Sequence, residues 1–264
     1  MEKITISRKD FIDVVKKINT VLQCEEVPMF ANICILVCNN CINFAVDCGE
    51  LLMTYSIPAK VEFEKSKKYL IYASTFREIA SKITDNHDVE MVVGENEIKM
   101  VALQGNDRCE MAMRINPGLP MECPDYREIV YRKFLSNRYK AIIEVSKTDL
   151  IEIDKKIWED RYIGKFGIVR FTVFKSGISV ASVNQQTWQT WKSTYKSISL
   201  NTFIRSNPSG KAVSFFLKDH LLRKALDLIN DNKVIIKALS GYVIIKSSNP
   251  YENIFTLIKQ SPPI

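Results

Sequence analysis

The 264-residue sequence has little of what most enzyme active sites need. It contains two histidines, His87 and His220, and neither lies near a serine or cysteine in a recognisable nucleophile motif. Glycine-rich phosphate-binding loops of the G-x-G-x-x-G and P-loop types are missing, as is the H-E-x-x-H zinc motif. The sequence therefore argues against an enzyme and predicts no catalytic residue, cofactor or bound metal.

Long apolar runs are also lacking. No stretch reaches the roughly 18 apolar residues that a membrane-spanning helix needs, and the N-terminus has no apolar signal core. Hydrophobic residues make up 46% of the chain and charged residues 25%, which is typical of a globular protein. The expected location is the cytoplasm, with no membrane partner.

Cysteine is confined to the first half of the chain. The count of seven is odd, and together with the missing export signal it predicts reduced thiols. Cys38 and Cys41 have C-x-x-C spacing, but a structural zinc site needs two more ligands at a second paired spacing, and none follows. The intervening Asn39 and Asn40, between two apolar runs, predict a two-residue hairpin turn. Zinc binding or redox activity is the less favoured alternative.

Charge is distributed unevenly between the halves. Residues 1–138 hold 18 Lys and Arg against 20 Asp and Glu, whereas residues 139–264 hold 19 against 10. The basic excess of the second half favours a polyanionic partner, although solvated faces of ordinary proteins carry similar excesses.

Two collinear matches show an internal duplication. Residues 6–18 align with residues 145–157 at a shift of 139, with Ser, Asp, Ile and Lys-Lys-Ile recurring in place. In a second match, five residues of the first half align with five of the second half at a shift of 146. They are Phe76, Ile79, Ile83, Asp85 and Asn86, which align in this order with Leu222, Ala225, Ile229, Asp231 and Asn232.

Each copy predicts the order strand, helix, four strands, helix, three strands. Ser7 and Ser146 are expected to cap the first helix of each copy, and Asp219 the second helix of the second copy. The first helices bury one apolar face each: Phe11, Val14, Val15 and Ile18, and Leu150, Ile153 and Ile157. The predicted strands of the first copy include 32–38, 41–47, 51–57, 68–73 and 109–115.

Three prolines and a glycine between residues 116 and 125 predict a surface connector, because this composition cannot continue a helix or a central strand. The predicted domains are therefore a first module at 1–116, a connector at 117–137 and a second module at 138–264. Apolar residues 129, 130, 131 and 134 are expected to anchor the later part of the connector.

Several segments of the first copy resemble the bacterial β sliding clamp. Residues 110–115, Glu-Met-Ala-Met-Arg-Ile, resemble the Met-Pro-Met-Arg-Leu ending of that family's module. Residues 116–126 are similar to the connector after its first domain, and residues 27–32 to its Leu-Pro-Ile-Leu-x-Asn segment. The resemblance implies an α+β fold of two tandem sliding-clamp-type modules, each with two helices packed on antiparallel sheets.

The resemblance also implies a function without chemistry. Sliding clamps encircle duplex DNA as processivity factors and bind DNA polymerase and clamp loader through short linear motifs. Bacterial clamps have three modules per chain, so a six-module ring of two-module chains implies a homotrimer with head-to-tail contacts. The second copy departs from the family because it lacks the Met-Ala-Met-Arg ending.

Two sets of site residues follow from the resemblance. The family's helices line the hole, so basic residues on their solvent faces are expected to bind DNA phosphates: Lys9, Lys16, Lys17, Arg77, Lys82, Lys155, Lys156, Arg223 and Lys224. An apolar partner-peptide pocket is expected from residues of the connector and the C-terminal tail: Leu119, Met121, Ile129, Ile258, Pro262, Pro263 and Ile264. A solvated helix face and a tail packed for stability are the respective alternatives.

Two other functions stay open at this point. One is a clamp-fold regulator that binds polymerase or clamp partners without encircling DNA. The other is an open single-strand-binding module that stacks bases on Trp188, Trp191 and Tyr195, which lie in a polar stretch.

Overall fold

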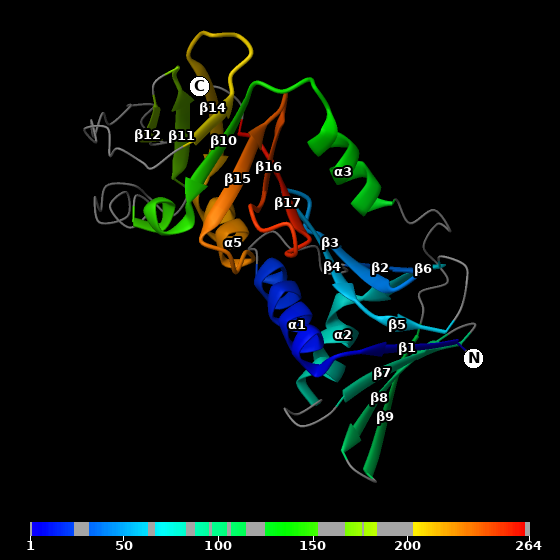
Figure 1. Cartoon of the computed structure of the whole chain (residues 1–264). Helices are drawn as coiled ribbons and strands as arrows, with labels where there is room; N and C mark the ends of the chain where they lie inside the picture. Colours follow the sequence, from blue (N-terminus) through cyan, green and yellow to red (C-terminus); the bar gives the residue numbers. More distant parts are fainter. Residues whose placement is uncertain are drawn as a thin grey trace. The chain divides into compact units, whose positions relative to one another are not determined.

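The computed structural model divides into two compact units, residues 1–129 and 130–264, called module 1 and module 2 below (Figure 1). The residues that the structure describes are 2–23, 32–62, 67–82, 88–94, 97–104, 107–114, 125–152, 167–175, 177–183 and 203–261. The segment at 27–31 that resembles the clamp family, the last residue of the strand predicted at 109–115 and the proline-rich part of the connector lie outside these ranges.

Module 1 is built from two sheets of antiparallel pairs. One has the strand order β5-β1-β7-β8-β9, and β6-β2-β3-β4 are consecutive in another. The strand bounds are β1 Glu2–Ile6, β2 Asn32–Cys38, β3 Cys41–Asp47, β4 Leu51–Pro58, β5 Lys60–Val61, β6 Lys67–Tyr72, β7 Asp88–Val93, β8 Glu97–Gln104 and β9 Asp107–Arg114. The central residues of β2 and β3 are buried on both faces, which explains their continuous apolar runs.

Helix α1 (Arg8–Leu22) begins where the sequence predicts. The Ser7 hydroxyl oxygen accepts a hydrogen bond from the Asp10 backbone N–H at 3.2 Å, so it satisfies one of the free donors of the first turn. Phe11, Val14 and Ile18 are buried, whereas Val15 is only half-buried. The predicted cap and most of the predicted apolar face are confirmed.

A cluster of aromatic rings holds both helices of module 1 on the sheet. Phe76 belongs to α2 (Ala73–Lys82), and its ring centroid lies 6.2 Å from those of Phe11 on α1 and Phe44 on β3. All three side chains are at most 2% exposed. This packing covers the apolar faces of both helices and leaves their other faces polar.

The hairpin between β2 and β3 is confirmed. Cys38 pairs with Cys41 across a two-residue turn in which Asn40 has φ 63°, a left-handed conformation that asparagine tolerates. Cys38, Cys41 and Cys48 are not disulfide-bonded. Cys34 is disulfide-bonded, so the expectation that every thiol is reduced is wrong.

Module 2 repeats this architecture. Strands β13-β10-β15-β16-β17 are consecutive in one sheet, and β12-β11-β14 form another. The bounds are β10 Ala141–Ser146, β11 Ile168–Val173, β12 Ile178–Val183, β13 Phe203–Ser206, β14 Val213–Lys218, β15 Lys233–Ala238, β16 Tyr242–Ser247 and β17 Ile254–Lys259. With helical residues 147–152 and α5 (Asp219–Asp227), the predicted element order is confirmed in both modules, apart from the short additional strand β5.

The two helices of module 2 begin differently. The Ser146 hydroxyl oxygen accepts from the Asp149 N–H at 3.3 Å, as predicted for a cap. Asp219, in contrast, is the first residue of α5 rather than its cap, and Lys218 occupies the N-cap position but its side chain makes no capping hydrogen bond. The correction follows from the chain path: β14 runs directly into α5, and the Asp219 N–H donates to the Gly167 carbonyl at 3.0 Å.

Helix α3 (Tyr126–Leu135) lies inside the predicted connector, and the division between the two units falls within it. Sequence analysis did not predict this helix. Asp125 accepts a hydrogen bond from the Glu128 N–H at 2.9 Å, so Asp125-Tyr-Arg-Glu128 is an N-cap signal that could have found it. Of the residues expected to anchor this segment, Val130 is fully buried, whereas Ile129 is 39% and Tyr131 50% exposed, so the expectation holds only in part.

Within module 2, Lys237 of β15 holds the C-terminal end of α3. The Lys237 ammonium donates to the carbonyl oxygens of Phe134 and, at 2.7 Å, of Ser136. Its Nζ lies 5.3 Å from the Phe134 ring centroid, and the Phe134 ring meets that of Phe255 at 5.6 Å. A cation at a helix C-terminus satisfies free carbonyls and interacts favourably with the helix dipole.

We expect Lys237→Met to lower the free energy of unfolding of module 2 by about 2 kcal/mol, because two carbonyl groups lose their donor. Hydrogen exchange of residues 130–135 should accelerate as the end of α3 is released. Lys259→Met, at an exposed position of β17, is the control and should change neither quantity. Unchanged exchange in Lys237→Met would contradict the assigned role.

The same lysine predicts a pH dependence. Burial lowers the pKa of the Lys237 ammonium below its ordinary value of 10.5. Between the lowered pKa and 10.5 the unfolded chain binds more protons at this site, so the contribution of Lys237 to the free energy of unfolding rises with pH through that window. Urea titrations should show the difference between wild type and Lys237→Met growing from neutral pH toward about pH 10. A difference that shrinks would refute this assignment.

Candidate nucleic-acid interface

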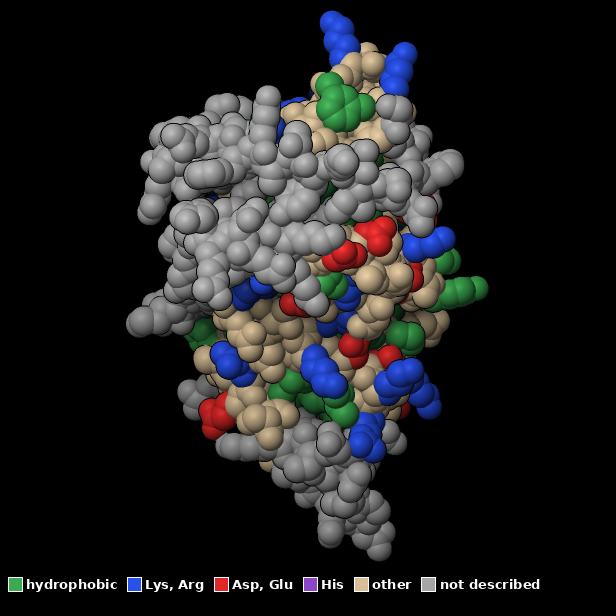
Figure 2. All heavy atoms as spheres, turned by 90° about the vertical axis from the view of Figure 1, so that its left-hand side faces the viewer, with side chains coloured by type: hydrophobic (Ala, Val, Ile, Leu, Met, Phe, Trp, Pro, Cys, Tyr) green, Lys and Arg blue, Asp and Glu red, His purple; other side chains and the backbone are tan. Residues whose placement is uncertain are grey.

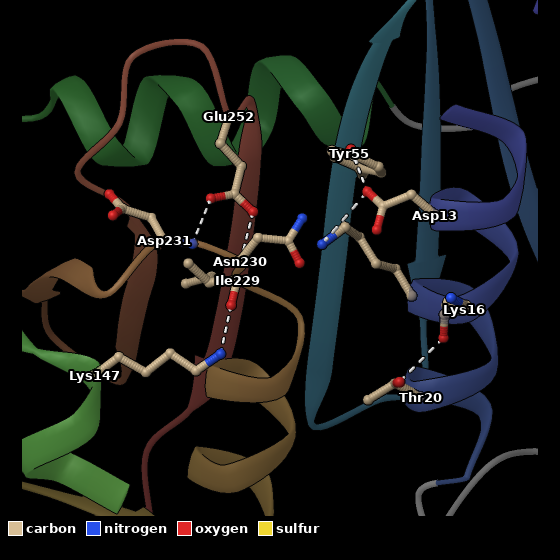
Figure 3. A network of polar contacts seen from close by, with 10 residues as sticks. Asp13, Lys16, Thr20, Tyr55, Lys147, Ile229, Asn230, Asp231 and Glu252 are labelled. Atoms are coloured by element: carbon tan, nitrogen blue, oxygen red, sulfur yellow. Dashed lines mark hydrogen bonds and ion pairs between the residues drawn. The ribbon is translucent and has the colours of Figure 1, made fainter. Parts of the chain in front are cut away.

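The solvent face of α1 carries two of the predicted DNA-binding lysines. Lys9 and Lys16 are exposed, and neither has an ion-pair partner among the salt bridges of the described residues. The Lys16 carbonyl accepts from the Thr20 hydroxyl at 3.0 Å, which leaves the Lys16 side chain uninvolved in that bond (Figure 3). Both side chains are therefore exposed to solvent.

Lys17 does not belong to this solvent face, so its assignment to DNA binding needs correction. Its side chain is 3% exposed, and Nζ lies 3.7 Å from the Asp13 carboxylate and 5.1 Å from the Tyr55 ring centroid. The Tyr55 hydroxyl donates to the same carboxylate at 2.6 Å (Figure 3). Neighbouring residues on a helix are separated by about 100°, which turns Lys17 toward the sheet while Lys16 faces solvent.

The second helix of module 1 supplies Arg77, whose side chain is exposed on α2. Lys82 is the last residue of this helix, and its side chain lies outside the described part of the structure. Arg77 joins Lys9 and Lys16 as the predicted DNA-binding residues of module 1 that are exposed on a helix.

In module 2, Arg223 and Lys224 of α5 are half-buried. Arg223 Nε lies 3.8 Å from the Asp219 carboxylate one turn earlier and forms an i,i+4 ion pair with it. This carboxylate offsets part of the positive charge that Arg223 could offer to a ligand. Lys155 and Lys156 lie outside the described residues. The prediction for module 2 therefore rests on Lys224 and, more weakly, on Arg223.

A polar network that sequence analysis missed joins the helix ends of module 2 (Figure 3). Lys147 Nζ donates to the Ile229 carbonyl at 2.6 Å, just beyond α5. The Glu252 carboxylate accepts from the backbone N–H groups of Asn230 at 2.7 Å and Asp231 at 3.1 Å. The partners are 82, 22 and 21 residues apart along the chain, so no local motif predicts them.

The helical residues from 147 onward are tied to the same region by Asn232. Its side-chain oxygen accepts from the Thr148 hydroxyl at 2.6 Å and from the Thr148 N–H at 3.2 Å. The repeat had marked Asp231 and Asn232 as a recurring pair, and in module 2 both take part in this network.

Two of the seven residues predicted to form the partner-peptide pocket, Ile129 and Ile258, belong to the described part of the chain. Ile258 is completely buried in β17 and cannot line an open groove, so its assignment to the pocket is wrong. Ile129 on α3 is 39% exposed. Leu119, Met121, Pro262, Pro263 and Ile264 lie outside the described residues, as do Trp188, Trp191 and Tyr195 of the alternative base-stacking platform.

On the face seen in Figure 2, the described Lys and Arg side chains are interspersed with those of Asp and Glu rather than gathered in one patch. In the part of the chain that the structure describes, no group of three or more His, Cys, Asp and Glu residues is arranged to hold a metal ion. None of the described helices is both long and apolar enough to cross a membrane.

Comparison with known proteins agrees with the sequence resemblance. Residues 2–117 match the family model of the DNA polymerase III beta subunit, N-terminal domain. No curated protein matches the sequence. The resemblance to bacterial sliding clamps is thus confirmed for the first part of the chain at the level of sequence.

Solved bacterial structures extend the similarity to the whole chain. The DNA polymerase III subunit beta of Pseudomonas aeruginosa matches with a TM-score of 0.73 and 12% identity, covering 99% of this chain and 66% of that one. The sliding clamp of Bacillus subtilis gives 0.68 and 14%, covering 100% and 65%. The Helicobacter pylori beta clamp bound to a DNA ligase peptide gives 0.68 and 13%, covering 99% and 66%. This chain therefore has the fold of a sliding clamp over slightly less than two thirds of those chains' length.

Substitution of the two adjacent lysines of α1, Lys16 and Lys17, should change the free energy of unfolding by different amounts. We expect Lys17→Gln to reduce the free energy of unfolding of module 1 by about 1–2 kcal/mol, because the Asp13 carboxylate and the Tyr55 ring lose their cation. Lys16→Gln is the matched control and should stay within about 0.5 kcal/mol of wild type. Equal urea midpoints for the two variants would show that the Lys17 contacts contribute nothing.

Proposed function

We propose that this chain is a DNA sliding clamp, a processivity factor without enzymatic activity that encircles duplex DNA as a homotrimeric ring. The observation that carries the proposal is a sliding-clamp fold in which helix surfaces present Lys9, Lys16 and Arg77. These cations suit sliding because phosphate contacts carry no sequence information and exchange readily along the duplex.

The proposed trimer is a ring of six modules. Three chains of two modules supply six, and a ring of identical chains must close through heterologous, head-to-tail contacts. Strand β9 is at one end of its sheet among the described strands and pairs with β8 there. An edge strand of this kind can extend its sheet with a strand from another copy.

Partner proteins follow from the same proposal. A DNA polymerase and a clamp loader would dock on the ring through short linear motifs. The Helicobacter pylori clamp, which shares this fold at 13% identity, binds a DNA ligase peptide, and this supports peptide capture as the mode of docking. The location of the peptide site stays a prediction from the sequence.

Two measurements test the ring. Sedimentation at several concentrations should give a species of three chain masses, about 90 kDa for a chain of 30.3 kDa. Chains dissociated by dilution and then concentrated with closed circular DNA should remain on the circle during gel filtration and leave when the circle is cut. The same DNA supplied in linear form is the control. A monomer at micromolar concentration, or equal retention on both forms, would exclude encirclement.

The helix lysines should contribute to DNA affinity through counterion release. Lys9→Gln and Lys16→Gln should each lower the slope of log affinity against log salt by about 0.9, because each removes one phosphate contact. Lys60→Gln, at an exposed position on strand β5, should leave the slope unchanged. Binding to a short linear duplex, measured at several salt concentrations, distinguishes these outcomes. If Lys9→Gln and Lys16→Gln keep the same slope as wild type and Lys60→Gln, the DNA does not contact α1.

A further inference from the structure

The loop between β16 and β17 presents one aromatic side chain to solvent. The loop covers residues 248–253, and Tyr251 within it is 91% exposed, more than any other described large apolar side chain. Module 1 has no counterpart of this length, since β8 and β9 are paired as far as Gln104 and Asp107. The loop is therefore a feature of module 2 that the duplication did not supply.

Hydrogen bonds hold this loop in one conformation. The Tyr251 N–H donates to the Asn249 side-chain oxygen at 3.0 Å, and the Glu252 N–H donates to the Asn249 carbonyl at 3.2 Å. The Asn249 N–H donates to the Asp231 carboxylate at 3.0 Å, and the Ser248 N–H to the Lys233 carbonyl at 2.9 Å. A preorganised loop loses little conformational entropy when its exposed side chain binds a partner.

The loop also lies beside the helix ends of module 2. Glu252 binds the backbone N–H groups of Asn230 and Asp231, which follow α5 directly. Ile229, one residue earlier, accepts the bond from Lys147 at the start of the other helix (Figure 3). Tyr251 is consequently attached to the framework that positions both helices expected to face DNA.

The chemistry around the loop suits a phosphate backbone. Exposed residues near it carry hydrogen-bond donors: Thr148, Asn232, Lys233, Asn249 and Asn253. Three carboxylates contact the loop or its anchor, and each already accepts bonds: Glu252 from two backbone N–H groups, Asp231 from the Ser247 hydroxyl and the Asn249 N–H, and Glu144 from the Ser248 hydroxyl. Lys, Thr, Asn and Tyr side chains are among the usual phosphate and sugar contacts of DNA-binding proteins.

We propose that Tyr251 is a DNA-contacting residue whose phenolic hydroxyl donates a hydrogen bond to a backbone phosphate of the duplex. Lys233, an exposed residue whose carbonyl accepts from the Ser248 N–H of the loop, supplies a cation in the same region. The inference rests on the proposed clamp function and adds a contact outside the helix faces. The hydroxyl rather than the ring makes this contact, because the bases of a duplex are stacked on one another and offer no free face to a tyrosine.

The test compares affinities for a linear 30-base-pair duplex over a range of salt concentrations. Tyr251→Phe should weaken binding by roughly tenfold through loss of a hydrogen bond to a charged group, with no change in the salt slope. Lys233→Gln should instead lower the slope by about 0.9. Tyr72→Phe, at a 38% exposed tyrosine of β6, is the matched control and should bind like wild type. Because the backbone and Asn249 hold the loop, Tyr251→Phe should retain the wild-type unfolding midpoint.

A chemical measurement supports the comparison without a variant. Duplex DNA should protect Tyr251 from nitration by tetranitromethane, while Tyr72 reacts equally with and without DNA. If the wild-type chain is retained on closed circles but Tyr251→Phe binds within twofold of wild type and Tyr251 remains reactive, this inference is overturned and the clamp function stands. If Tyr251→Phe impairs polymerase stimulation alone, the contact is with a protein and the inference is likewise overturned. A wild-type chain that is not retained on circles overturns both.

Discussion

Each helix of this protein can offer a polar face to a ligand only because its apolar face is held on a sheet. In module 1 this constraint is met by one aromatic contact, where Phe76 of α2 lies between Phe11 of α1 and Phe44 of β3. In module 2, Leu222, Ala225 and Leu226 of α5 are buried in the same way. The exposed lysines and arginine of the helices depend on this packing, because a helix free to rotate would present no defined charged surface.

Burial also decides which cations are available. Lys16 and Lys17 are neighbours in sequence, yet Lys16 faces solvent and Lys17 binds Asp13 and lies over the Tyr55 ring. Lys237 on strand β15 shows the same principle. Its ammonium is buried and binds a carbonyl oxygen just beyond the C-terminal end of α3, so it is not available to a polyanion. Removing a cation from water is costly unless carboxylate, carbonyl or aromatic partners replace the lost hydration. Net charge alone therefore overstates the basic surface of the molecule.

In module 2 the same hydrogen bonds serve the fold and the proposed binding surface. Glu252 satisfies the backbone N–H groups that follow α5, and Asp231 binds the loop that carries Tyr251. Lys147 joins the start of one helix to the end of the other. Rigid helix ends keep the exposed basic side chains of the helices at fixed positions relative to one another, so they define the surface that a polyanion would meet.

The sequence by itself determined the duplication, the order of elements in each module, the caps of the first helices and the hairpin at Asn39 and Asn40. These features follow from local periodicity and turn chemistry, which act over a few residues. Only the tertiary structure decided that Lys17 and Ile258 are buried, that Asp219 lies inside α5 and that α3 docks on Lys237. Each of these depends on what a residue meets across the fold: the bond from Lys237 to Ser136 spans 101 residues, and that from Lys147 to Ile229 spans 82. No pattern confined to one segment can record such contacts, because burial is a property of the assembled core.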